Sequence, residues 1–220
     1  MRREYTHITV ILDRTGSMEC IRDDTIGGFN TFLKQQKQEP GRATMTLVQF
    51  DTQDPYEVIH KFKPLKDIPD LTRETFVPRA ATPLLDAMGQ GVNDLEDTLA
   101  YLPRDRRPTG IVMVIVTDGE ENSSREFSKD QIAKMVKEKQ DKAGWQFVFL
   151  SADLAAINDA IAIGVRQGSA MAFDRTAQGA SSAFAASSRW VSEYRSGRSK
   201  DVSFTKEDRD QQDAERRRKS

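Results

Sequence analysis

Residues 7–17 have the sequence HITVILDRTGS, and this stretch decides most of what the chain predicts about its fold. Its first six residues are apolar or β-branched, apart from His7, as in a strand that is buried on both faces. The chain then turns through residues 13–17, and a helical pattern of apolar residues begins at Met18. A buried strand that leads directly into a helix is typical of a parallel α/β sheet.

The rest of the chain alternates in the same way. Apolar runs predict five further strands, at residues 44–50, 56–62, 111–116, 145–150 and 170–173. Apolar residues at helical spacing predict helices between them, including one that Thr82 and Pro83 open. This alternation predicts a doubly wound, mostly parallel six-stranded sheet with helices on both faces. The short polar link at residues 51–55 predicts a hairpin, so the third strand should be an antiparallel edge strand.

Composition limits the class of protein. The 220 residues fit one ordinary domain, and the balance of 33 basic against 34 acidic residues argues against nucleic acid as a partner. Cys20 is the single cysteine, which excludes an intrachain disulfide and favours a reducing compartment. We find no signal-peptide pattern and no apolar stretch of the ~18 residues that a membrane helix needs. The expectation is a soluble cytoplasmic protein without membrane association.

The composition changes after residue 196. Residues 197–220 are mostly charged or small and polar, with Val202 and Phe204 as their sizeable apolar side chains. Such a segment has little apolar surface to bury, so the sequence predicts a folded domain over residues 1–196 and a disordered charged tail over residues 197–220.

Oxygen-bearing side chains gather at the predicted strand and helix ends: Asp13, Thr15, Ser17, Thr82 and Asp118. Since the carboxyl ends of parallel strands meet at one edge of a sheet, we expect these side chains to converge there. Two carboxylates and three hydroxyls suit a hard divalent cation, Mg²⁺ or Mn²⁺, while this low ligand charge fits Ca²⁺ less well. Arg14 lies in the same turn, where it could contact a partner at the rim. Each of these residues alone could equally be an ordinary helix N-cap.

The pattern resembles the von Willebrand factor A (vWA) domain of the compact bacterial or phage type. That family carries a metal-ion-dependent adhesion site, or MIDAS, written D-x-S-x-S … T … D. Here it corresponds to Asp13, Thr15, Ser17, Thr82 and Asp118, with threonine in place of the usual first serine. The resemblance covers about residues 5–195 and implies a metal at the top of the sheet that binds an acidic group of a protein partner, without catalysis. It also suggests an associated ATPase as a partner.

Two other functions compete with this interpretation. The metal could serve only to stabilise a structural or assembly component, which the fold alone does not exclude. The turn after the first strand is also similar to that of a haloacid dehalogenase-type phosphatase. That family needs a second aspartate where Thr15 stands and a threonine where Ser17 stands, so a magnesium-dependent phosphohydrolase is the weaker hypothesis.

Overall fold

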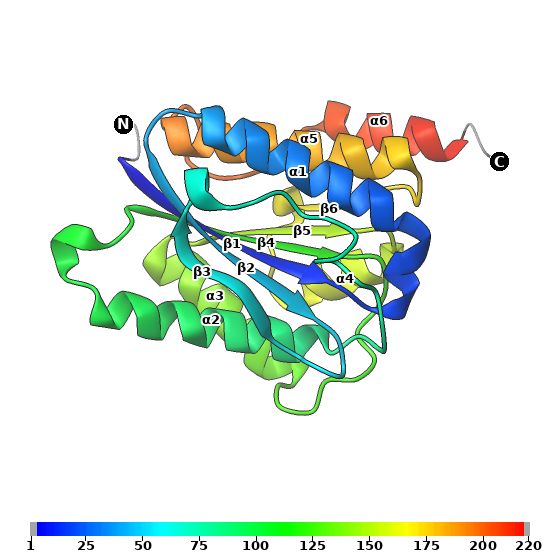
Figure 1. The fold of residues 1–220 in the computed structure, drawn as a ribbon, viewed down its shortest axis with the longest axis horizontal. Helices are drawn as coiled ribbons and strands as arrows, with labels where there is room; N and C mark the ends of the chain where they lie inside the picture. Colours follow the sequence, from blue (N-terminus) through cyan, green and yellow to red (C-terminus); the bar gives the residue numbers. More distant parts are fainter. Residues whose placement is uncertain (1–3, 218–220) are drawn as a thin grey trace.

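The protein is built on one six-stranded sheet, seen in a computed structural model that describes residues 4–217 (Figure 1). The strand order is β3-β2-β1-β4-β5-β6, and every neighbouring pair is parallel except β2 and β3. This confirms the predicted sheet and its antiparallel edge strand. The strands are β1 (Tyr5–Asp13), β2 (Arg42–Phe50), β3 (Glu57–Pro64), β4 (Gly110–Thr117), β5 (Gln146–Ser151) and β6 (Ala170–Ala172).

Helices cover both faces of the sheet (Figure 1). The α-helices are α1 (Arg22–Gln38), α2 (Leu84–Tyr101), α3 (Lys129–Ala143), α4 (Leu154–Ala162), α5 (Ala177–Ser196) and α6 (Lys206–Arg217). Short 3₁₀ turns are η1 (Gly16–Ile21), η2 (Leu65–Asp67), η3 (Arg104–Arg106) and η4 (Gln167–Ser169). The helix predicted from Met18 therefore starts as the 3₁₀ turn η1, and the helix predicted to open at Thr82 starts at Leu84.

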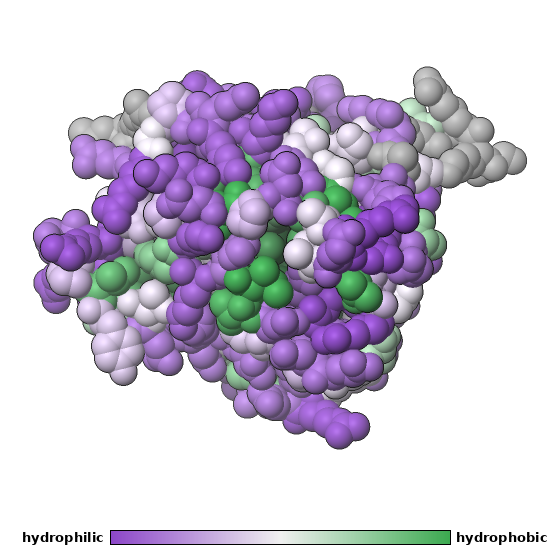
Figure 2. Space-filling view, in the orientation of Figure 1, coloured by the Kyte–Doolittle hydropathy of each residue, from purple (hydrophilic) through white to green (hydrophobic). Residues whose placement is uncertain are grey.

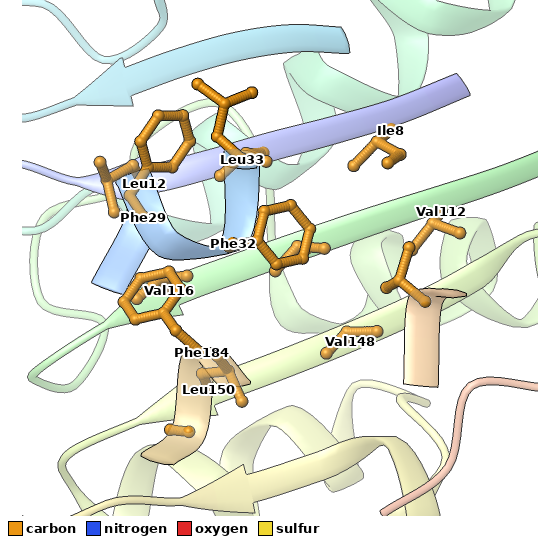
Figure 3. Close-up of a cluster of buried hydrophobic side chains, with 14 of the residues drawn as sticks. Ile8, Leu12, Phe29, Phe32, Leu33, Val112, Val116, Val148, Leu150 and Phe184 are labelled. Atoms are coloured by element: carbon orange, nitrogen blue, oxygen red, sulfur yellow. The ribbon is translucent and has the colours of Figure 1, made fainter. Parts of the chain in front are cut away.

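The sheet separates two apolar cores. One contains side chains of α1 and α5 packed on the strands, including Phe29, Phe32 and Phe184 (Figure 3). The other lies under α2, α3 and α4. Helix α1 approaches α5 so closely that a Cβ on Gly28 would lie 2.2 Å from a ring carbon of Phe184. This contact explains why a glycine is kept inside the helix despite its cost in helix propensity.

The central strands fix where a site can form. All nine residues of β1 and all eight of β4 are buried, and the two strands pair in parallel from Thr6 and Gly110 to Leu12 and Val116. The chain leaves β1 towards β2 on one side, whereas β4 continues the sheet on the other side. The carboxyl ends of β1 and β4 therefore flank the point where the strand order reverses, which is the usual ligand position in such sheets.

The chain after residue 196 differs from the predicted disordered tail. Val202 and Phe204 are buried in the core shared by α1 and α5, and α6 follows them. The Asp208 side chain accepts hydrogen bonds from Trp190 Nε1 (2.8 Å) and the Thr205 N–H (2.8 Å). Two apolar anchors and one buried carboxylate thus attach a segment whose average composition is polar. Residues 218–220 of the predicted tail lie outside the described part.

One face of the molecule is largely polar. In the orientation of Figure 1, hydrophilic residues cover most of the visible face, and hydrophobic ones gather near its middle (Figure 2). Within residues 4–217, no helix combines the length and apolar character needed to span a membrane.

Candidate metal centre

The ends of β1 and β4 bring two acidic side chains to the same edge of the sheet. Asp13 is the last residue of β1, Asp118 follows the last residue of β4, and both are fully buried. Thr117, one residue earlier, donates from Oγ1 to Asp13 Oδ2 over 2.5 Å. The end of one strand therefore holds the carboxylate of the other strand in place.

The turn after β1 adds two hydroxyl groups. The Thr15 N–H donates to Asp13 Oδ1 over 2.7 Å, which folds the turn back on the strand end. Thr15 Oγ1 lies 3.2 Å from Ser17 Oγ, and Ser17 Oγ donates to Asp118 Oδ1 over 2.6 Å. Asp13, Thr15, Ser17 and Asp118 thus form one connected group at the edge of the sheet where the strand ends predicted that they would converge.

Thr82 reaches this edge through the backbone of its loop. The Gly16 N–H donates to the Ala80 carbonyl over 3.0 Å, so the loop before Thr82 lies against the turn. Thr82 exchanges two hydrogen bonds with Asn122: its N–H donates to Asn122 Oδ1 (3.0 Å), and its carbonyl accepts from the Asn122 N–H (3.2 Å). The loop after β4 therefore positions Thr82, which is itself buried.

Negative charge at this edge is only partly compensated. Burial raises the pKa of Asp13 to about 7, although hydrogen bonds from Thr117 and Thr15 oppose the shift. Asp118 Oδ2 is buried and accepts no hydrogen bond from the residues that the structure describes. An orphaned carboxylate oxygen beside a second buried acid is a costly arrangement, and a cation would relieve it.

The donor set fits a small divalent cation. The described residues contain no group of three or more histidine, cysteine, aspartate and glutamate side chains placed to hold a metal. The oxygens gathered here come instead from two carboxylates and the hydroxyls of Thr15 and Ser17, with Thr82 on the adjoining loop. Hydroxyls and carboxylates of this kind suit Mg²⁺ or Mn²⁺ and leave coordination positions for water or another oxygen.

Arg14 is buried, whereas the sequence suggested a residue at the rim that could contact a partner. It is 6% exposed, and its Nε donates to Asp51 Oδ2 over 2.9 Å. Its Nη1 donates to Glu57 Oε2 (2.5 Å) and to Gln49 Oε1 (3.3 Å). Arg79 also donates to Asp51 Oδ2, over 2.8 Å. Arg14 therefore attaches the turn to β2 and β3, and Asp51 joins that turn to the loop that leads to Thr82.

Sequence reasoning missed the roles of several residues that shape the site. Thr117 resembled an ordinary residue at a strand end. Its position directly before Asp118 could have indicated that its hydroxyl donates to the neighbouring carboxylate of Asp13. Glu121 orders the loop after β4, since its carboxylate accepts from the N–H groups of Ser123 (2.8 Å) and Leu85 (2.9 Å). Arg175 lies in a loop 57 residues after Asp118, and no local signal in the sequence placed the two side by side.

An open pocket of about 620 Å³ lies next to Thr82. Its lining includes Ala81, Pro83 and Asn122, which all adjoin the loop that carries Thr82, and it extends to Ser123 and Arg125. Asp13, Thr15, Ser17 and Asp118 do not line this pocket, so it adjoins the loop that carries Thr82 rather than the connected group itself.

Comparison with solved structures identifies the fold. A vWA-type protein from Catenulispora acidiphila aligns with 87% of this chain and 43% of its own, with a TM-score of 0.57 and 11% identity. The chain has the fold of a von Willebrand factor A domain. The zinc-occupied MIDAS structure of proximal thread matrix protein 1 from the mussel byssus covers 86% of this chain and 46% of its own, at 12% identity and a TM-score of 0.60. Manganese-loaded TRAP protein from Plasmodium vivax covers 83% and 73%, at 14% identity and a TM-score of 0.57.

These similarities concern the vWA fold alone, because the sequence identities are low. This chain spans about half the length of the byssus protein, 46%, and 43% of the Catenulispora protein. Neither the protein-family models nor the curated protein sequences contain a match to it.

Proposed function

We propose that this chain is a metal-dependent protein-binding module. Asp13, Thr15, Ser17, Thr82 and Asp118 would hold a divalent cation at the edge of the sheet, and the cation would bind an acidic group of a protein partner. The observation that supports this most strongly is the convergence of two buried carboxylates with the hydroxyls of Thr15 and Ser17. One of these carboxylates, Asp118, has an oxygen without a hydrogen-bond partner among the described residues.

The ligand inventory explains why a partner would be needed. The two carboxylates balance the formal charge of a divalent ion, and the hydroxyls add no further negative charge. Such an ion keeps water or exchanges it for another anionic oxygen, and a carboxylate on a partner supplies one. Mg²⁺ is the ion that we favour, with Mn²⁺ as its closest substitute. Zinc in the byssus protein and manganese in the Plasmodium protein support a divalent ion on this fold.

The wider setting is part of the same proposal. We infer a cytoplasmic protein of bacterial or phage type, with an associated ATPase among its candidate partners and with no enzymatic activity of its own. The single cysteine and the resemblance to compact vWA proteins support this setting. Thr15 occupies the position where a phosphatase of the haloacid dehalogenase type needs a second aspartate, which argues against phosphohydrolase chemistry.

Affinity capture from native lysate tests the proposal. The tagged full chain is incubated in Mg²⁺ or in EDTA, beside Asp13→Ala and Ser17→Ala. Asp97→Ala, which removes an exposed aspartate from α2, serves as the control. A partner should be retained by the wild type and by Asp97→Ala in Mg²⁺, and should be lost in EDTA and in both site variants.

Two results would contradict this function. Equal capture with and without metal would remove the role of the cation. Metal that raises the melting temperature while Ser17→Ala leaves every interaction intact would favour a structural role instead. Circular dichroism of each variant must show the native helix content before its capture is compared.

A further inference from the structure

Arg175 places a positive charge at the candidate metal centre. It lies in the loop between β6 and α5, and its Nη2 donates to the Asp118 carbonyl over 2.5 Å. The same nitrogen lies 3.9 Å from Asp118 Oδ2, the buried oxygen that accepts no hydrogen bond from the described residues. Within the described part of the chain, this is the one cationic side chain at ion-pair distance from either aspartate of the centre.

We propose that Arg175 sets the metal affinity of this site by acting as an internal competitor for Asp118. In the absence of a divalent ion, its guanidinium group partly neutralises the carboxylate that the ion would use. Binding of the ion then requires that this arginine give up its pairing with Asp118 or tolerate a nearby double positive charge. The inference rests on the proposed metal-binding function and adds a residue that the MIDAS pattern does not contain.

The backbone that carries Arg175 is held at both ends. On the β6 side, the Phe173 N–H donates to the Ser151 carbonyl over 2.9 Å. On the α5 side, Thr176 caps the helix by accepting from the Gly179 N–H over 3.0 Å. A Cβ on Gly179 would lie 2.3 Å from the Asp174 carbonyl oxygen, so the loop is pressed against the first turn of α5. Arg175 therefore starts from a fixed anchor close to the centre.

The end of the chain supports the same loop. Gln212 of α6 is buried, and its Nε2 donates to the Gly179 carbonyl over 3.2 Å. Its Oε1 accepts from the Asp174 N–H over 3.4 Å. One side chain thus bridges the residue before Arg175 and the first turn of α5. The ordered segment after residue 196 consequently helps to hold the competing arginine in position.

The side chain itself retains freedom to move. The Arg175 side chain is 46% exposed, whereas the Asp118 side chain is fully buried. Leaving Asp118 would move the guanidinium group into solvent at the cost of its hydrogen bond to the Asp118 carbonyl, and the anchored backbone would keep it close enough to return. An ion pair of this exposure is worth about 1 kcal/mol, which corresponds to about a fivefold change in affinity.

Competition between Arg175 and the ion predicts the direction in which metal affinity changes when the arginine is replaced. Replacing Arg175 by glutamine should tighten the binding of a divalent ion by about fivefold, because the competing cation is gone. Arg175→Lys should stay close to the wild type, because it keeps the charge. A residue that served only to hold the loop would have the opposite effect, since a loosened site binds metal more weakly.

Calorimetric titration of the metal-free full chain with Mn²⁺ tests the inference. The matched control is Arg166→Gln, because Arg166 is 42% exposed at its side chain and also forms an ion pair, with Asp201, but lies at the other end of β6. Melting temperatures in EDTA provide a readout without metal. Arg175→Gln should melt below the wild type in EDTA, and the difference should vanish or reverse in saturating Mn²⁺.

The outcomes separate this inference from the proposed function. The competition and the metal function are both supported if Arg175→Gln binds Mn²⁺ more tightly than the wild type while Arg166→Gln does not. Binding that appears only in Arg175→Gln supports both as well. Equal or weaker binding in Arg175→Gln, with normal binding in the wild type, overturns the competition and leaves the metal function intact. An absence of Mn²⁺ binding in both proteins at millimolar concentration overturns both.

Discussion

Asp51 and Asp118 are two fully buried carboxylates at the same edge of the sheet, with very different surroundings. Asp51 follows β2 and accepts hydrogen bonds from Arg14, Arg79 and the Gln53 N–H. Burial alone would raise the pKa of Asp51, but these bonds and one from the Asp54 N–H hold it below its usual value. The Asp51 carboxylate therefore finds its hydrogen-bond donors within the protein and serves the structure.

Asp118 has fewer partners than Asp51. Its Oδ1 accepts from Ser17, and its Oδ2 has Arg175 at 3.9 Å and no hydrogen bond among the described residues. The comparison teaches that burial alone does not mark a functional acid. A buried carboxylate with a full set of internal donors stabilises the fold, whereas one with an unused oxygen fits the proposed binding of a ligand from outside.

The largest expected effect is on stability. Asp51→Ala leaves the buried guanidinium group of Arg14 with less compensation and should cost about 3–5 kcal/mol of unfolding free energy. The loss should be the same in EDTA and in Mg²⁺, because Asp51 belongs to the internal network. Urea denaturation measures it. A loss that appears in Mg²⁺ alone would show that Asp51 acts through the metal centre, against the comparison.

The next effect concerns pH. The pKa of Asp13 is about 7 in the folded protein and lies near 3.8 in the unfolded chain. At a pH between these two values, the folded state therefore holds a proton on Asp13 that the unfolded state has released. The contribution of Asp13 to the stability of the metal-free protein should therefore rise as the pH falls from 7 towards 4, by up to about 4 kcal/mol.

Asp13→Asn should lack this gain, and denaturant curves in EDTA at several pH values provide the measurement. The direction is opposite to that expected from Asp51, whose depressed pKa makes its contribution disappear as the pH falls through that pKa. A flat difference between wild type and Asp13→Asn would refute the buried, uncompensated state of Asp13.

A smaller effect is expected at Thr117, which supports one of the proposed metal ligands. Thr117→Val removes the hydroxyl that holds Asp13 Oδ2, and supports of this kind contribute about 10- to 100-fold to metal affinity. Thr9→Val is the matched control, since the Thr9 hydroxyl on β1 is buried without a hydrogen-bond partner among the described residues. Mn²⁺ titration should show weaker binding in the first variant and unchanged binding in the second. Equal affinities would remove Thr117 from the site.

Much of the fold was predictable from local patterns. The run before Asp13 is apolar or β-branched apart from His7, and residues 111–116 are apolar throughout, so their identity as central strands followed directly from the sequence. The polar link after β2 predicted the antiparallel edge in the same way. Because parallel strand ends coincide in space, Asp13, Thr15, Ser17 and Asp118 could be grouped before any distance was known.

Other features depend on contacts between distant segments. Arg14 has no neighbour in sequence that indicates its pairing with Asp51 and Glu57, so it resembled an exposed rim residue. Val202 and Phe204 are too few to raise the average hydropathy of the last segment, yet both fill the core. Arg175 reaches Asp118 only because β6 lies on the far side of β5 and the chain returns towards β4.

Titration of the wild type and of Asp118→Asn with Mg²⁺ tests the central claim most directly, with binding heat and melting temperature measured together. The account predicts saturable binding in the wild type and a gain of about 2.7 kcal/mol in stability at 100 times the Kd. It predicts neither in Asp118→Asn, which should still fold. Binding of Mg²⁺ to Asp118→Asn with the affinity of the wild type, or an absence of saturable binding in the wild type, would contradict it.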